Sequence, residues 1–304
     1  MTEPRGQELI NRYRWNYGIA KDAELTEKMI LAHWTLEQRL TRELLESTPE
    51  NRWETFERCY TTLYGELEWL NRLTGGTDTT SPAERYQHWA DLIGSSPKSV
   101  YEVGSGKAAM IGHLAQLGHQ CTATEITRER GAKHVVEHLN LRWTQSDGIH
   151  LERFEQPGIY DFVLSDNVIE HMHPDDLIHH FEGACKILKP GGQYLMAVPH
   201  RWFGPCDISK VFKYEVASGM HLKEYTYREL RHALLYSGFR EVAAVRMPPP
   251  HSTEPARADT RWMRRICLME ALFSPFARPI LRGRVEGMAE RAGIASLIFL
   301  AATK

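Results

Sequence analysis

The sequence predicts an α/β fold built on a mostly parallel β-sheet, and two features of the chain support this prediction. From about residue 98 onward, short apolar runs alternate with segments of helical periodicity, as in strands joined by helices. The first run, 99–104, breaks into Gly104-Ser105-Gly106 before a helical segment that continues to about Leu117. We therefore expect a strand, a tight turn and a helix here, a local structure that commonly binds a nucleotide.

Length and composition are those of an ordinary globular protein. The chain has 304 residues, of which 42% are apolar and 25% are charged, and its net charge of −2 provides no overall basic surface for nucleic acid. The five cysteines are widely spaced and form no C-x-x-C pair, which argues against disulfides and zinc. No secretory signal follows Met1, and the apolar run 294–302 is too short to span a bilayer. We expect a cytoplasmic protein.

Residues 1–95 are predicted to be helical. Apolar residues recur at helical spacing over 25–44 and again over 53–70, and Ser81-Pro-Ala-Glu84 has the pattern of a capping box that opens a third helix. Three aromatic residues precede the first long helix and either belong to the core or form a lid over a ligand site: Tyr13, Trp15 and Tyr17.

Polar residues end several of the predicted strands. The strands are 99–104, 120–126, one ending at 146–148, 160–167, 193–200, 239–247 and 295–302. Glu125 lies about twenty residues after the glycine turn, Asp147 and Gly148 follow the third strand, and Asn167 ends the fourth. Because ligands bind at the carboxyl edge of such sheets, we expect these residues to surround one ligand.

Glu102 indicates the charge of that ligand. It lies two residues before Gly104, where a carboxylate would repel the pyrophosphate of a dinucleotide. A cationic ligand would be favoured instead, and S-adenosylmethionine carries an ammonium and a sulfonium. An NAD-dependent oxidoreductase is therefore disfavoured.

These motifs resemble those of class I S-adenosylmethionine-dependent methyltransferases, and are most similar to the small-molecule subgroup that includes ubiquinone-biosynthesis enzymes. The resemblance covers about residues 95–248 and the last strand. The motifs that carry it are Glu102-Val-Gly-Ser-Gly106, Glu125, Asp147, Asp161–His171, Leu188-Lys-Pro-Gly-Gly192, Val198-Pro-His200 and His221-Leu-Lys-Glu-Tyr-Thr226.

The resemblance implies a Rossmann-like sheet of seven strands, with the last strand antiparallel beside the fifth. It also implies contacts with S-adenosylmethionine. Gly104, Ser105 and Gly106 would line the methionine part, Glu125 with its neighbour Ile126 the ribose, Asp147 and Gly148 the adenine, and Asn167 the floor beneath the sulfonium.

The expected organisation is an N-terminal helical extension or lid over 1–95, a cofactor-binding core over 96–248, an Arg-rich helical insert over 249–294 and a last core strand over 295–304. The insert carries eight arginines against five acids, which would suit an anionic or lipid-linked acceptor or peripheral membrane contact through 257–284. A solvated helix packed on the sheet is the favoured interpretation of the same pattern.

Four residues that follow strand ends are the candidates for catalysis, because removing a proton from a hydroxyl or carbon acceptor needs a base and histidine suits neutral pH. They are Glu170, His171, His200 and His221, whereas His173, His179 and His180 are expected on a solvated helix face. Some relatives bind a divalent cation through E-x-x-E-H and a later histidine. Here Asn167 replaces the first carboxylate, so we expect no metal.

The leading prediction is methyl transfer from S-adenosylmethionine to a small-molecule acceptor, with O-methylation favoured. Carbon or nitrogen methylation, or a catalytically silent partner subunit that binds S-adenosylmethionine, are the alternatives. A nucleic-acid amino-methylase is disfavoured, because the fourth strand ends in Ser165-Asp-Asn-Val168 and not in an Asn/Asp-Pro-Pro-aromatic motif. The oligomeric state is not predicted.

Overall fold

The computed structural model describes residues 3–74, 80–128, 140–247, 254–274, 287, 289 and 294–304. The chain divides into two compact units. The first unit consists of Met1–Thr80 and Phe203–Glu224, and the second of Ser81–Trp202 and Tyr225–Lys304.

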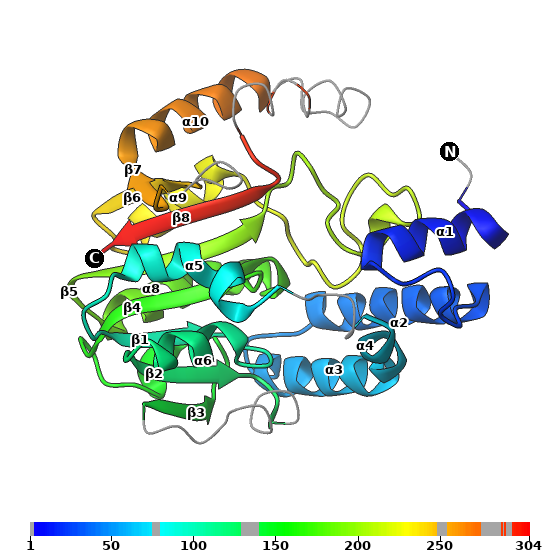
Figure 1. The fold of residues 1–304 in the computed structure, drawn as a ribbon, viewed down its shortest axis with the longest axis horizontal. Helices are drawn as coiled ribbons and strands as arrows, with labels where there is room; N and C mark the ends of the chain where they lie inside the picture. Colours follow the sequence, from blue (N-terminus) through cyan, green and yellow to red (C-terminus); the bar gives the residue numbers. More distant parts are fainter. Residues whose placement is uncertain are drawn as a thin grey trace. The chain divides into compact units, whose positions relative to one another are not determined.

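The second unit is built on one β-sheet of eight strands in the order β3-β2-β1-β4-β5-β8-β6-β7 (Figure 1). The strands are β1 Ser99–Val103, β2 Gln120–Glu125, β3 Leu141–Gln145, β4 Tyr160–Asp166, β5 Leu188–Pro199, β6 Glu241–Arg246, β7 Arg257–Asp259 and β8 Leu297–Thr303. The first five strands pair in parallel, and β8 lies antiparallel between β5 and β6. The predicted mostly parallel α/β sheet, with the last strand beside the fifth, is confirmed.

The described sheet has one strand more than the seven expected. β7 pairs antiparallel with β6 at the edge of the sheet, with Ala244 opposite Asp259 and Arg246 opposite Arg257. The segment was expected to belong to a helical insert. Three residues are too few for an alternating pattern to stand out in a sequence.

Helices of the second unit cover the sheet and position its loops. They are α5 Pro82–Ile93, α6 Ala109–Gln116, α8 Leu177–Ile187, α9 Tyr227–Tyr236 and α10 Thr260–Phe273, with the short 3₁₀ turns η2 Leu151–Arg153, η3 Ile169–His171 and η4 Pro174–Asp176. The capping box predicted at Ser81 is present, since its hydroxyl accepts the N–H of Glu84 and the Glu84 carboxylate accepts that of Ser81.

Two neighbouring residues of β5 show that helices pack on both faces of the sheet. Leu195 belongs to a core cluster with Trp89 of α5 and Ile111 of α6. The ring of Tyr194 lies 5.9 Å from that of Phe181 on α8. Because successive strand residues point to opposite faces, α8 covers the face opposite to α5 and α6.

The first unit is helical, as predicted for the N-terminal region. It contains α1 Gly6–Tyr17, α2 Glu27–Leu45, α3 Arg52–Glu66, α4 Glu68–Thr74 and the 3₁₀ turn η5 Ile208–Lys210. The helix expected over 53–70 is divided at Leu67, just after Gly65, and glycine is a poor helix former.

The 203–224 segment belongs to this unit through its contacts with the N-terminal helices. The Arg12 guanidinium donates to the carbonyls of Lys210 and Val211, and Phe212 stacks on Trp34 at 4.9 Å between ring centroids. Among the residues that the structure describes, no helix is both long and apolar enough to cross a membrane.

Candidate functional site

A cavity of about 550 Å³ opens within the second unit, at the carboxyl edge of β1 and β4. It is lined by five of the residues predicted from the sequence to bind the cofactor: Glu102, Gly104, Ser105, Gly106 and Asn167. Residues of α5, the start of α6 and the start of β8, together with Lys107 and Asp166, complete the lining. The structure therefore brings together the glycine turn and the end of the fourth strand, as expected for parallel strands.

The turn after β1 requires glycine. Gly104 has a φ of +64°, and a methyl group at this position would lie 2.7 Å from Cγ2 of Val168. Asn167, which precedes that valine, also has a positive φ of +55°, which asparagine tolerates better than most residues. The loops after β1 and β4 thus approach one another closely at the cavity.

Glu102 is the most perturbed acid of the cavity. It is 4% exposed, and its Oε2 has no hydrogen-bond partner among the described residues. Burial, together with the nearby carboxylates Asp166 and Glu125, raises the pKa of Glu102 to about 8. A buried carboxylate oxygen without a partner is costly, so the arrangement fits a cationic ligand that supplies one.

Glu125 ends β2 and is tied to the glycine turn. Its Oε1 accepts the N–H of Gly106 at 2.8 Å, and its Oε2 accepts the N–H of Ile126 at 3.2 Å. A carboxylate offers about four acceptor positions. These two bonds orient the group beside the glycine turn.

The loop after β3 is held by its own side chains. Oδ1 of Asp147 accepts the N–H groups of Ile149 and His150 at 2.8 and 2.9 Å, and the N–H of Gly148 donates to the Ser146 hydroxyl. Gly148 has a φ of +69°. The loop is therefore preorganised in a conformation that glycine permits.

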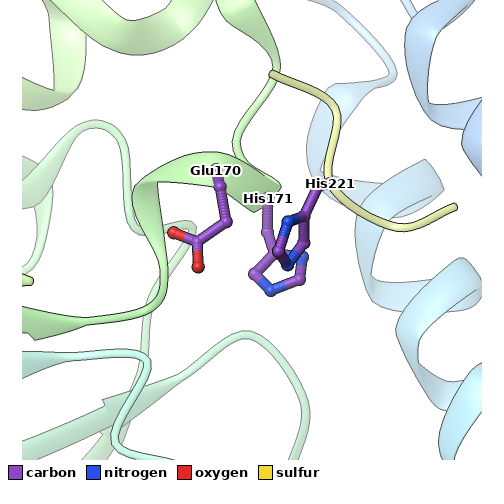
Figure 2. Close-up of side chains that lie close together, drawn as sticks. All are labelled: Glu170, His171 and His221. Atoms are coloured by element: carbon purple, nitrogen blue, oxygen red, sulfur yellow. The ribbon is translucent and has the colours of Figure 1, made fainter. Parts of the chain in front are cut away.

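Two catalytic candidates, Glu170 and His171, lie shortly after Asn167 of the cavity in the sequence. Figure 2 shows that the side chains of Glu170 and His171 leave the same short turn, η3. Glu170 is fully buried and His171 is half-buried. Both therefore belong to the unit that carries Asn167.

His221, also drawn in Figure 2, is part of the first unit. Its Nδ1 lies 3.1 Å from Oε1 of Glu224, which also accepts the N–H of Cys206. Burial raises the pKa of Asp207, and the electrostatic interaction with His221 lowers it in part.

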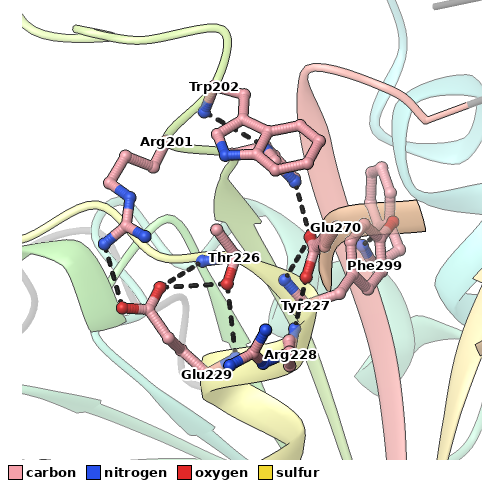
Figure 3. Close-up of polar contacts among 9 residues, drawn as sticks. Arg201, Trp202, Thr226, Tyr227, Arg228, Glu229, Glu270 and Phe299 are labelled. Carbon is pink, nitrogen blue, oxygen red and sulfur yellow. Dashed lines mark hydrogen bonds and ion pairs between the residues drawn. The ribbon is translucent and has the colours of Figure 1, made fainter. Parts of the chain in front are cut away.

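His200 has partners on both ring nitrogens. Its Nδ1 accepts the N–H of Trp202 at 3.1 Å, so Nε2 carries the proton and donates to Glu270 at 2.8 Å. Glu270 also accepts the N–H groups of Tyr227 and Arg228, and Figure 3 shows it at the start of α9. This arrangement caps the helix and uses His200 structurally.

The histidines expected on a solvated helix face differ from one another. His179 is exposed, but His173 is 7% exposed and His180 is fully buried, so the expectation is wrong for these two. For His180 the reason is the packing of α8, which buries a stripe made of Leu177, His180, Phe181 and Ala184. His173 lies before this helix, where its Nδ1 accepts the N–H of Asp175 at the start of η4.

Sequence reasoning missed the contribution of α5 to the cavity. Arg85, Tyr86 and His88 line it, as does Asp166 at the end of β4. The capping box predicted that a helix begins at this point, but no local pattern shows which of its faces meets the ligand.

Most of the described part of the Arg-rich segment lies in β7 and α10, and α10 packs against β6 and α9. Its exposed side carries Arg261, Arg264 and Arg265, together with Leu268 and Leu272. The other arginines of the segment that follow α10, at 278, 282, 284 and 291, lie outside the described residues.

Solved structures similar to this chain include several methyltransferases. One is a SAM-dependent methyltransferase from Archaeoglobus fulgidus, with 16% identity, 72% of this chain and 91% of that chain covered, and a TM-score of 0.49. A phosphoethanolamine N-methyltransferase from Haemonchus contortus has 18% identity and a TM-score of 0.49, and the match covers 85% of this chain and 61% of that chain. A 1,6-didemethyltoxoflavin N1-methyltransferase from Burkholderia thailandensis has 14% identity and a TM-score of 0.46, and the match covers 85% of this chain and 91% of that chain.

These similarities are too weak to indicate a substrate, and no curated protein matches the sequence. A family model described as a methyltransferase domain matches residues 81–244. This match spans more than half of the 304 residues, and the chain therefore belongs to the methyltransferase-domain family, whose enzymes take the methyl group from S-adenosylmethionine.

Proposed function

We propose that the cavity of the second unit binds the methionine part of S-adenosylmethionine, with Glu102 accepting its ammonium group. The observation that carries the proposal is the buried Oε2 of Glu102, which lacks a partner among the described residues. Arg85 and Lys107 also line the cavity and would face the carboxylate of the methionine part.

The rest of the cofactor would follow the carboxyl edge of the sheet. Glu125 would accept the ribose hydroxyls beside Ile126, and Asp147 and Gly148 would receive the adenine. Asn167 would form the floor beneath the sulfonium. When bound, the sulfonium supplies an electrophilic methyl group for in-line displacement, so the protein contributes mainly by positioning the reactants.

The acceptor is proposed to be a small molecule that is methylated on oxygen, as in the small-molecule subgroup that the motifs resemble. His171 is the first candidate for the base, because it lies four residues after Asn167 on the same loop. His221 is the second candidate, and Glu224 orients its ring. His200 is not proposed as the base, because both of its ring nitrogens are hydrogen-bonded.

The segments outside the sheet, 1–95 and 249–294, are proposed to select the acceptor. The exposed arginines of α10 favour an anionic or lipid-linked molecule. Methylation of carbon or nitrogen, or a role as a silent binding subunit, are the alternatives that the following experiments separate.

Titration calorimetry with S-adenosylhomocysteine tests cofactor binding without knowledge of the acceptor. We expect the wild-type protein to bind, Glu102→Gln to bind at least about ten times more weakly, and Glu241→Gln, at an exposed glutamate of the same unit, to bind like wild type. Failure of the wild-type protein to bind would refute the proposal.

Screening metabolite extracts for release of S-adenosylhomocysteine identifies the acceptor and tests the base. With an acceptor in hand, His171→Ala or His221→Ala should lower kcat about 100-fold or more. If both variants keep normal kcat from pH 6 to 9, neither histidine is the base. Binding of S-adenosylhomocysteine without turnover of any extract would favour the silent subunit.

A further inference from the structure

A chain of four hydrogen-bonded polar groups, three of them buried side chains, crosses the second unit from the loop after β3 to the end of β4. The imidazole Nδ1 of His180 is hydrogen-bonded to the carbonyl oxygen of Gly148, and its Nε2 lies 2.7 Å from the Tyr194 hydroxyl. That hydroxyl lies 2.8 Å from the hydroxyl of Ser165. His180, Tyr194 and Ser165 are all fully buried.

The direction of each hydrogen bond follows from the carbonyl at one end. A carbonyl oxygen only accepts, so Nδ1 of His180 must carry a proton. Burial lowers the pKa of His180 to about 4, so the ring is neutral and Nε2 accepts from Tyr194. The Tyr194 oxygen then accepts from Ser165. One proton arrangement satisfies every group.

Both ends of this chain adjoin residues assigned above to the cofactor. Gly148 follows Asp147 in the loop proposed to receive the adenine. Ser165 immediately precedes Asp166 and Asn167, which line the cavity.

The helix that carries His180 also touches this loop at a second point. A methyl group at Gly183 would lie 2.8 Å from the carbonyl oxygen of Ile149, so α8 and the loop are in close contact. The loop conformation therefore depends on α8 as well as on its own Asp147 turn.

We infer that His180 is a positioning residue for S-adenosylmethionine: its Nδ1–H holds the Gly148 carbonyl, and through it the loop that receives the adenine. This inference rests on the proposed function, which places the adenine at Asp147 and Gly148. His180 lies beneath the loop and acts on the cofactor only through it.

Two amide variants separate the roles of the two ring nitrogens. In His180→Asn the amide N–H can replace Nδ1–H, whereas in His180→Gln the amide reaches the position of Nε2 and the bond to Gly148 is lost. We expect His180→Asn to bind S-adenosylhomocysteine within about threefold of wild type, and His180→Gln about tenfold more weakly. His179→Gln, at the exposed neighbouring residue of α8, is the matched control and should bind like wild type.

A shorter ligand distinguishes contacts with the adenine from contacts with the ammonium group. 5′-Methylthioadenosine contains the adenosine part but no ammonium group. Its affinity should fall in His180→Gln and stay unchanged in Glu102→Gln, whereas S-adenosylhomocysteine should lose affinity in both variants. Circular dichroism and thermal unfolding establish that the variants are folded.

The inference is overturned if folded His180→Gln binds both ligands as tightly as His180→Asn does. In that case His180 only fills the core. Absence of S-adenosylhomocysteine binding by the wild-type protein would overturn the proposed function, and this inference with it. Failure of the wild-type protein to bind therefore indicates that the proposed function is wrong, whereas a binding wild type with equally tight binding by both variants indicates that only this inference is wrong.

Discussion

Binding of the cofactor product at Glu102 should release a proton. The carboxyl has a pKa of about 8 in the ligand-free protein, raised first by burial and then by Asp166 and Glu125. At pH 7 roughly nine in ten molecules are therefore protonated at this position. An ammonium group stabilises the ionised form, so the pKa of Glu102 falls in the complex and the proton is released.

The pH dependence of affinity follows from the same pKa. About 1% of Glu102 is ionised at pH 6 and about half at pH 8, so the affinity for S-adenosylhomocysteine should rise roughly 50-fold over this interval. The sign is fixed, because only the ionised carboxylate attracts the ammonium. Above pH 8 the gain should level off as ionisation becomes complete.

Calorimetric titrations in phosphate and in Tris measure the released proton, because the two buffers differ in their heats of ionisation. We expect about 0.9 proton per molecule bound at pH 7. Glu102→Gln should bind weakly, with an affinity that does not change between pH 6 and 8. A wild-type affinity that is flat over this range, with no proton released, would refute the role assigned to Glu102.

Three further predictions concern stability, each measured by urea unfolding. Glu102→Gln should stabilise the ligand-free protein by on the order of 3 kcal/mol at pH 7. The reason is that the pKa of Glu102 is higher in the folded than in the unfolded protein, so the wild-type protein loses stability as the pH rises from the unfolded-state pKa toward 8. Equal stability of the wild-type protein at pH 5 and 7 would contradict this. Gly104→Ala should destabilise by about 1–3 kcal/mol, because its methyl group would lie 2.7 Å from Val168 at a positive φ, while Gly112→Ala, in the open on helix α6, should stabilise by about 0.5–1 kcal/mol. Glu270→Gln should cost about 1–3 kcal/mol, because an amide N–H then faces the backbone donors at the start of α9.

The sheet was predictable because its strands are continuous apolar runs bounded by glycine or polar residues. This pattern reproduces β1, β2 and β4 to within one residue of the observed ends. It fails where local signals are weak. β7 is three residues long, and the division between α3 and α4 at Leu67 interrupts a regular apolar stripe that continues across it.

The convergence of the candidate cofactor residues on one cavity was predictable for a topological reason. Parallel strands end at one edge of the sheet, so Glu102, Gly104 and Asn167 converge although they are far apart in sequence. The contribution of α5 was not predictable. Arg85 and His88 reach the cavity only because of how their helix packs on the sheet, and a helical pattern does not specify that packing.

Histidine roles were the least predictable, because they depend on what each ring nitrogen contacts. His200 lies at a strand end, where a catalytic base is expected, yet Trp202 and Glu270 occupy both of its nitrogens. The sequence predicts that His180 lies on a solvated helix face, yet the residue is buried and both of its ring nitrogens are hydrogen-bonded.

Such satisfied groups stabilise the fold, and their replacement is expected to change stability or the position of a loop. Glu102 is different. Its buried Oε2 finds no partner among the described residues, and burial suppresses its ionisation in the ligand-free protein. The carboxylate costs stability in the free protein, and the proposed ligand ammonium is the interaction that would compensate for this cost. The ligand-linked proton release proposed above is the direct measure of that interaction.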